Sequence, residues 1–383
     1  MEKSGSTSST SSGPYVCADL LESLLHEIIV LINSFQDFLA FTGTCHSWRA
    51  AVSSFPSVYA FSFPPLHFEP HGPYVPPHSG YIKPLRMSSC KWKLSDLTKK
   101  NLSLQCSVPQ NTPNEMHYLG CSHGYLIFTY EEHCLLIDAY TGAKVKAPEL
   151  PRDITIGFFS GIGVLTAPFG SPNSRLLLFS KDSMFEWQVG TNSWSEHPLY
   201  LERECICQVV SFKGHILVID ALMRLHTIQL TPQFSVNRIE VSWWSLQKFP
   251  ICPLLVVCGD MLLLVNLSIA KIGSTRNFGE PSVRYFEVFR LDLSVKPAKW
   301  IQMKKLENLV LFLSLDRRNP AFSCMNPERW GGKSNCIYVA RLFDDANPDE
   351  TWTVLEVGQS VPSHDIVDRT LCLMVWDSHR TTA

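Results

Sequence analysis

The chain has 383 residues, of which 45% are hydrophobic and 18% charged, and its formal net charge is −2. This length favours two or three domains, or one large repeat domain with an attachment. The near-neutral charge provides no broad attraction to nucleic acid or to an anionic membrane, so neither is expected as a partner. The apolar run over 20–32 is too short and too charged to cross a bilayer, and no secretory signal surrounds it. An intracellular protein is expected, in the cytoplasm, the nucleus or both.

A disordered tail followed by a small helical domain is expected at the N-terminus. Residues 1–14 are mostly Ser, Thr and Gly, which have too little apolar surface to offset their ordering entropy. Three short helices are expected within residues 15–56. The apolar residues of the first helix recur at helical spacing in two adjacent rows. These rows are Leu20, Leu24, Ile28 and Leu31, with Leu21, Leu25, Ile29 and Ile32 beside them.

The second and third helices are predicted from capping signals. Ser34 is followed three residues later by Asp37, a pairing typical of the start of a helix. The second helix is therefore expected to begin there and to end near Gly43. A third short helix is expected to carry Cys45 and Trp48.

A proline-rich linker is expected to lead into a β-propeller. Seven prolines fall within residues 57–84, which excludes a helix there. Residues 85–383 instead show short β-rich runs bounded by turn residues, with hydrophobic strands beginning after Gly124, Gly214 and Gly259. Radial blades protect the edges of many short antiparallel strands. About six blades fit the length best, although five or seven also suit repeats this degenerate.

Tryptophans recur late in these repeats. Trp194, Trp300 and Trp352 are expected to pack between blades. Trp243 and Trp244 are consecutive, so on a strand their side chains would face opposite ways and one would be exposed. These two residues are the candidate contacts with a target protein.

Motifs that resemble catalytic or ligand sites are incomplete. Residues 331–334 read Gly-Gly-Lys-Ser, but a phosphate-binding loop needs Gly six residues before the Lys, and Pro327 stands there. Cys205 and Cys207 lack the spacing of paired zinc ligands, and a matching second pair is missing. The thirteen cysteines are expected to stay thiols in a reducing compartment. We therefore expect no catalytic residue, no metal and no cofactor.

The N-terminal segment resembles the F-box family. That family's pattern is roughly Leu-Pro-x-x-Leu-Leu-x-x-Ile, then a helix, then Cys-Arg-x-Trp-Arg. Here 20–28 read Leu-Leu-Glu-Ser-Leu-Leu-His-Glu-Ile, and 45–49 read Cys-His-Ser-Trp-Arg. Leu21 stands where the family usually has Pro, and His46 where it usually has Arg. The resemblance implies docking on a Skp-type adaptor, which joins a cullin and a RING subunit. The residues implied in that contact are Leu20, Leu24, Leu25, Ile28, Ile29, Phe38, Leu39, Cys45 and Trp48.

The rest of the chain is similar to plant F-box proteins with a C-terminal, kelch-like propeller of the KIB type. The residues that carry the similarity are Cys121-Ser-His-Gly-Tyr-Leu, Asp138-Ala-Tyr-Thr-Gly and Pro148-x-Leu-Pro151. It implies a substrate-recruiting adaptor of an SCF-type cullin–RING E3 ubiquitin ligase, with the propeller binding an unknown target protein. Two other interpretations stay open. One is a propeller interaction protein that never joins a ligase, and the other is a propeller enzyme or glycan-binding protein.

Overall fold

The computed structural model describes most of the chain from residue 20 to residue 361. The described ranges are 20–32, 34–53, 64–70, 91–95, 97, 103–107, 116–139, 141–151, 161–201, 206–242, 253–271, 282–314, 316–340 and 352–361. The expected disordered tail, residues 1–14, lies outside them, and only 64–70 of the expected linker is described.

Three short helices precede the strands, as the sequence predicts. They are α1 (Glu22–Leu31), α2 (Phe35–Thr44) and α3 (His46–Ser53), here called the helical unit. The predicted cap of α2 is confirmed. The Ser34 hydroxyl accepts a hydrogen bond from the Asp37 amide at 3.2 Å and donates one to the Asp37 carboxylate at 2.6 Å. The helices pack around a small core of Leu25, Ile29, Ile32, Phe41 and Ala51.

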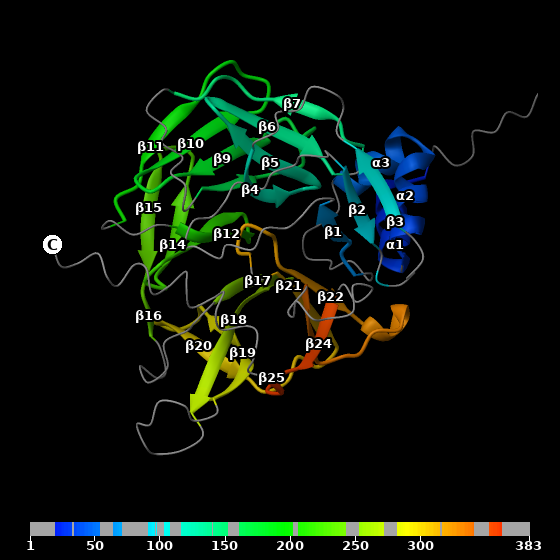
Figure 1. Ribbon diagram of the computed structural model, residues 1–383, viewed down its shortest axis with the longest axis vertical. Helices are drawn as coiled ribbons and strands as arrows, with labels where there is room; N and C mark the ends of the chain where they lie inside the picture. The colour runs from blue at the N-terminus through cyan, green and yellow to red at the C-terminus, as the bar shows by residue number, and fades with distance from the viewer. Residues whose placement is uncertain are drawn as a thin grey trace, which may run out of the picture.

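The strands of the described residues form six sheets, five of which are the blades of a ring (Figure 1). Blade 1 holds β4 (His117–Ser122), β5 (Tyr125–Tyr130), β6 (His133–Asp138) and β7 (Lys144–Lys146). Blade 2 holds β8 (Ile162–Leu165), β9 (Arg175–Phe179), β10 (Ser183–Gln188) and β11 (Ser195–Pro198). Blade 3 holds β12 (Ile206–Phe212), β13 (His215–Asp220), β14 (Leu225–Gln229) and β15 (Ser235–Ile239). Short apolar runs separated by turn residues predict hairpins at 134–147 and 176–189, and both are confirmed, as β6–β7 and β9–β10.

The last two blades depart from a simple antiparallel repeat. Blade 4 holds β17 (Leu254–Cys258), β18 (Met261–Lys271), β19 (Ser282–Asp292) and β20 (Ala298–Met303). Two short strands join it: β16 (Val241–Ser242), parallel to β20, and β25 (Ser360–Val361), antiparallel to β19. Blade 5 holds β22 (Phe322–Met325), β21 (Leu309–Leu313), β23 (Cys336–Ala340) and β24 (Trp352–Glu356). A 3-10 helix, η1 (Pro327–Trp330), follows β22, and β21 runs parallel to β23.

The prediction of about six blades is wrong, because the propeller has five. The remaining sheet has three strands: β1 (His67–Pro70), β2 (Lys91–Ser95) and β3 (Ser103–Ser107). The length of the chain before β4 suggests a further blade, but these residues form the smaller sheet instead. Its first strand lies in the proline-rich stretch and ends at Pro70, which lacks the N–H needed to extend a ladder.

Buried side chains hold neighbouring blades together. A blade is covered by a neighbour on each face, and a sheet covered on both faces must be apolar on both. In β9, Leu176, Leu177, Leu178 and Phe179 are all buried for this reason. Two of the predicted packing tryptophans are confirmed. Trp300 is buried between blades 3 and 4. Trp194 packs between blades 1 and 2, and its indole donates to the Pro148 carbonyl at 3.0 Å. Trp352 packs edge-on to Phe312 within blade 5 and to His67 of β1.

A loop closes the inner ring between blade 5 and blade 1. The inner strands β4, β8, β12, β17 and β22 contact one another in that order. Residues 316–319, here called the closing loop, then reach β4. The Arg318 guanidinium donates to the Tyr118 carbonyl at 2.7 Å, and the Tyr118 hydroxyl donates to Asn319 at 2.6 Å. In Figure 1 this loop precedes β22 and lies at the centre of the ring.

Candidate functional site

One face of α1 is uncovered although the helix is part of a packed unit. Leu25 and Ile29 are buried, whereas Leu21 is 70% exposed, Leu24 42% and Leu31 66%. Leu24 and Leu31 lie on one side of the helix, because residues seven apart return to nearly the same angle, and Leu21 stands at its N-cap. An aliphatic surface of this kind on a small helical unit is typical of a contact with another protein.

The predicted adaptor contacts occupy different places in the helical unit. Leu25 and Ile29 lie inside its core, and Leu24 is exposed. Leu20, Ile28, Phe38 and Trp48 are partly buried against that core, with the Trp48 ring 4.5 Å from that of Phe41. Only the backbone of Leu39 is described. Leu21 and Leu31 are more exposed than Leu24. Neither of them is among the adaptor contacts that the F-box resemblance implies.

Cys45 stands at the start of α3, partly exposed. Its sulfur lies 3.1 Å from the Ser47 hydroxyl. That hydrogen bond, together with one from the Trp48 amide, lowers the pKa of the thiol. The thiol links the α2–α3 turn to the first turn of α3.

The helical unit is joined to blade 5 through η1. Arg329 donates to the last carbonyls of α1, with 3.2 Å to Val30 and 3.1 Å to Leu31. Carbonyls in the last turn of a helix can accept from such a donor, and a cation is favoured at this end of the helix dipole. Leu66, just before β1, also packs against both the helical core and the core of blade 1. The helices therefore have a defined position on the propeller.

We expect Arg329→Ala to loosen this joint while leaving the blades intact. The loss of two charge-assisted hydrogen bonds at an exposed site weakens the local docking by about 1 kcal/mol. Hydrogen exchange of the α1 amides is the measurement, and faster exchange there with unchanged exchange in β9 is the expected result. Arg290→Ala, which removes an exposed arginine from β19, is the control. Equal exchange rates in the two variants would contradict the proposed joint.

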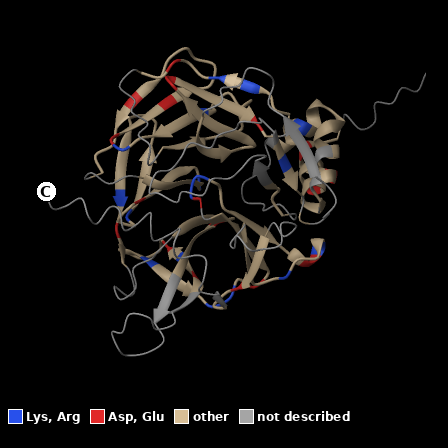
Figure 2. Cartoon of the chain, viewed as in Figure 1, with Lys and Arg blue, Asp and Glu red and all other residues tan. Residues whose placement is uncertain are grey.

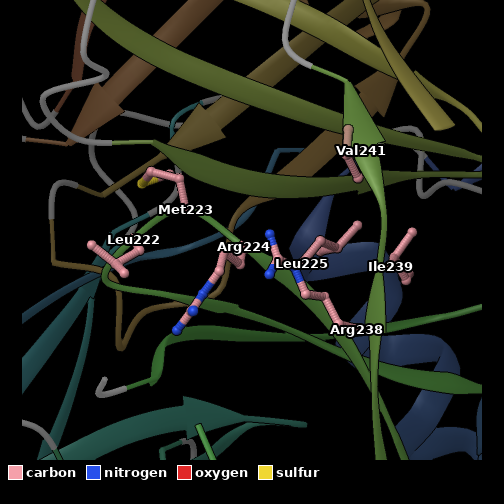
Figure 3. A pocket seen from close by; sticks show the side chains of 7 residues that line it. All are labelled: Leu222, Met223, Arg224, Leu225, Arg238, Ile239 and Val241. Atoms are coloured by element: carbon pink, nitrogen blue, oxygen red, sulfur yellow. The ribbon is translucent and has the colours of Figure 1, made fainter. Parts of the chain in front are cut away.

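A pocket lies at one end of blade 3 (Figure 3). Its volume is about 290 Å³, and it is lined by Leu222, Met223, Arg224, Leu225, Arg238, Ile239 and Val241. The lining comes from the β13–β14 turn, from β14 and from the junction of β15 with β16. Because successive strands of the blade are antiparallel, that turn and the exit from β15 lie at the same end.

A buried carboxylate holds the turn that forms one wall of the pocket. Asp220 is fully buried and accepts from the Arg224 guanidinium at 2.6 Å, the Arg224 amide at 2.8 Å and His226 at 3.0 Å. Burial acts to raise the pKa of Asp220, but the hydrogen bonds from His226 and Arg224 outweigh it and lower that pKa. Arg224 also donates to the Leu201 carbonyl at 3.3 Å, which ties the turn to the connection from blade 2.

The described residues offer little that resembles a catalytic or metal site. Within them, no group of three or more His, Cys, Asp and Glu side chains is placed to hold a metal ion. Burial raises the pKa of Cys121 to about 12 and that of Cys324 to about 11, so both thiols stay protonated at neutral pH. Residues 331–334 form the turn after η1, where Gly331 has a left-handed φ of 84°. None of the described helices is long and apolar enough to span a lipid bilayer.

The candidate target contacts Trp243 and Trp244 lie outside the described residues. They follow β16 directly, and β16 begins at Val241, which lines the blade 3 pocket. The pocket itself gave no signal in the sequence. Its residues come from two separate segments that only the folding of blade 3 brings together.

Distant similarities to solved structures were found, while the comparison with curated proteins found no match. The chain is similar to the N-terminal domain of Nup159, with 8% identity and a TM-score of 0.30 over 56% of this chain and 57% of that one. It is similar to BBS1N, solved in complex with ARL6DN, with 13% identity and a TM-score of 0.32 over 56% and 72%. It is also similar to U3-55K, with 10% identity and a TM-score of 0.33 over 56% and 75%. Likeness at this level carries no functional argument.

The family comparison is more informative. A family model described as the KIB1-4 beta-propeller matches residues 94–369, which is more than half of the chain. The match begins within β2 and extends past β25, so it includes all five blades.

Proposed function

The chain belongs to the KIB1-4 β-propeller family, and from this we propose that it is the substrate-recruiting subunit of an SCF-type cullin–RING ubiquitin ligase. The helical unit would act as the F-box and bind a Skp-type adaptor, and the propeller would hold the target protein. The ligase chemistry belongs to other subunits, so the chain itself would be non-catalytic. This role places it in the cytoplasm, the nucleus or both.

The observation that carries the proposal is the uncovered face of α1. Leu24 and Leu31 are exposed on one side of a helix that is packed through Leu25 and Ile29, and Leu21 is exposed at its N-cap. Exposed aliphatic anchors at helical spacing are the feature by which helix-in-groove partners recognise one another. The joint at Arg329 supports the same role, because it fixes the helical unit on blade 5 and so sets the distance between adaptor and target.

We expect Leu21→Asp combined with Leu24→Asp to abolish capture of a Skp-type adaptor. Each buried anchor of such an interface contributes about 2 kcal/mol, so loss of two lowers the affinity by more than about a hundredfold. Both side chains are exposed in the free chain, so the fold is expected to persist. Co-purification of the full chain with a Skp protein, followed by titration, is the measurement.

Leu293→Asp is the matched control for the adaptor experiment. Leu293 is 50% exposed in the turn between β19 and β20, within the propeller. The Leu293→Asp variant carries the same kind of change, from leucine to aspartate, but should bind the adaptor as the unmodified chain does. A doubly substituted helical unit that still captures the adaptor as well as Leu293→Asp would refute the ligase role. The chain would then be a propeller interaction protein outside the ligase.

A further inference from the structure

We infer that the blade 3 pocket is the docking site for the target protein, and that it takes a segment carrying a carboxylate next to a bulky apolar side chain. This inference rests on the proposed function and specifies where and how the target is held. It follows from the size, charge and rigidity of the pocket, and from its distance from the helical unit.

The size and lining of the pocket fit an amino-acid side chain. A volume of about 290 Å³ lies at the lower end of small-molecule sites, which favours one or two side chains over a cofactor. Met223, Leu225, Ile239 and Val241 give it an apolar lining. Leu222 at its edge is 59% exposed. An apolar anchor from a partner would cover the exposed parts of Leu222, Met223 and Ile239, while Leu225 is already buried.

The charge of the pocket selects an anionic neighbour for that anchor. Arg224 is neutralised by the buried Asp220. The Arg238 side chain is exposed, and none of the described residues forms a hydrogen bond or ion pair with its guanidinium. Figure 3 shows its side chain extending from β15 toward Arg224 and Leu225. The lining therefore presents one arginine outside an ion pair, Arg238, beside apolar side chains, which is complementary to a carboxylate next to an apolar side chain.

The wall of the pocket is preorganised. The turn carrying Leu222 and Met223 is closed by the Met223 amide donating to the Asp220 carbonyl at 2.9 Å, and by three contacts to the Asp220 carboxylate. A wall already held in place loses little conformational freedom when a partner binds. Arginine, which the pocket presents at Arg238, is among the residues enriched at the energetic centres of interfaces.

The pocket and the helical unit lie on opposite sides of the ring. In Figure 1, β14, β15 and β16 are on the left, whereas α1, α2 and α3 are on the right beside β1–β3. An adaptor bound to the helices would therefore leave the pocket accessible. Figure 2 shows basic and acidic residues interspersed over the blades, so the attraction at Arg238 is local rather than part of a broad basic face.

The test is binding of short fluorescein-labelled peptides to the full chain. The probes contain Glu-Leu or Glu-Phe flanked by Gly and Ser, with companions in which Glu is replaced by Lys or the apolar residue by Ala. The expected result is preferential binding of the Glu-Leu or Glu-Phe peptides, weakened at least about tenfold by Arg238→Glu. Leu222→Asp should weaken it as well, and Arg238→Glu should increase binding of the Lys peptides.

Arg290→Glu is the matched control, because Arg290 is an exposed arginine on β19 in another blade. Equal binding by Arg238→Glu and Arg290→Glu, or no preference for Glu over Lys, would overturn the assignment. So would tighter binding of phosphoserine peptides, or of phosphatidylserine vesicles, than of the Glu peptides. Adaptor capture is measured on the same variants and is expected to be unchanged. Failure of the docking-site assignment is thereby distinguished from failure of the ligase role, since peptide binding tests the first and adaptor capture tests the second.

Discussion

Replacing Gly120 by Ala should strongly destabilise the propeller, although the change adds only one methyl group. A Cβ at this position would lie 2.7 Å from the Gly163 carbonyl oxygen and 2.9 Å from that of Arg318. Both are backbone atoms, which cannot turn aside as a flexible side chain can. Gly120 also has a φ of 154°, at an irregularity in the pairing of β4 with β5. The clash and the strain together are expected to cost roughly 3 kcal/mol or more.

Two glycine controls separate the causes of that loss. Gly190 has a positive φ of 94° but open space around its Cβ, so Gly190→Ala measures backbone strain alone. Gly43 in α2 has neither feature, and Gly43→Ala is expected to be neutral or stabilising by up to about 1 kcal/mol. The free energy of unfolding in urea is the measurement. If Gly120→Ala were no less stable than Gly190→Ala, the close approach of β4, β8 and the closing loop would be disproved.

The second large effect is expected from Asp220→Ala. This substitution leaves Arg224 and the buried His226 without their shared carboxylate. Removal of one partner from a buried ion pair typically costs about 3–5 kcal/mol, and the lower end applies here because Arg224 retains some access to solvent. The β13–β14 turn should loosen at the same time, so peptide binding at the blade 3 pocket is expected to fall as well.

The contribution of Asp220 should depend on pH in a defined direction. Its pKa in the folded chain lies below the ordinary value of 3.8. A lowered carboxylate pKa stabilises the folded state above the unfolded pKa, and this stabilisation disappears as the pH falls through the folded pKa. The difference in unfolding free energy between the unmodified chain and Asp220→Asn should therefore be full at neutral pH and shrink below about pH 4. Asp260→Asn, in the exposed turn between β17 and β18, is the control. A pH-independent difference would contradict an ionised Asp220.

The helix start and the hairpins were predictable because the residues that determine each of them lie close together in the sequence. The Ser34–Asp37 cap marks the start of α2, and short apolar runs bounded by turns mark the β6–β7 and β9–β10 hairpins. The two rows of α1 were also visible in the sequence. The burial of the row that holds Leu25 and the exposure of Leu24 in the other row were not, because they depend on where α3 packs.

The number of blades was mispredicted because degenerate repeats show the total length of the β-rich region but not where each blade begins and ends. A stretch of short strands has the same sequence pattern whether it forms a full blade or the three-stranded sheet β1–β3. The pairing that decides between them joins His67 to Ser95, across a proline-rich segment with no periodic signal. Blade 5 shows the same limitation, because β22 takes the inner position although it follows β21 in the chain.

By itself, the amino-acid sequence determined that this protein has a small helical unit ahead of a β-propeller, because periodicity, caps and turns act over short distances. Only the tertiary structure decided how the ring closes and where the pocket lies. Tyr118 meets Asn319 across 201 positions, and Arg329 meets Val30 across 299. Contacts so distant leave no local pattern, since each partner is an ordinary polar residue until the fold brings the two together. The same holds for Arg238, which becomes a candidate for recognition only beside the turn that Asp220 holds in place.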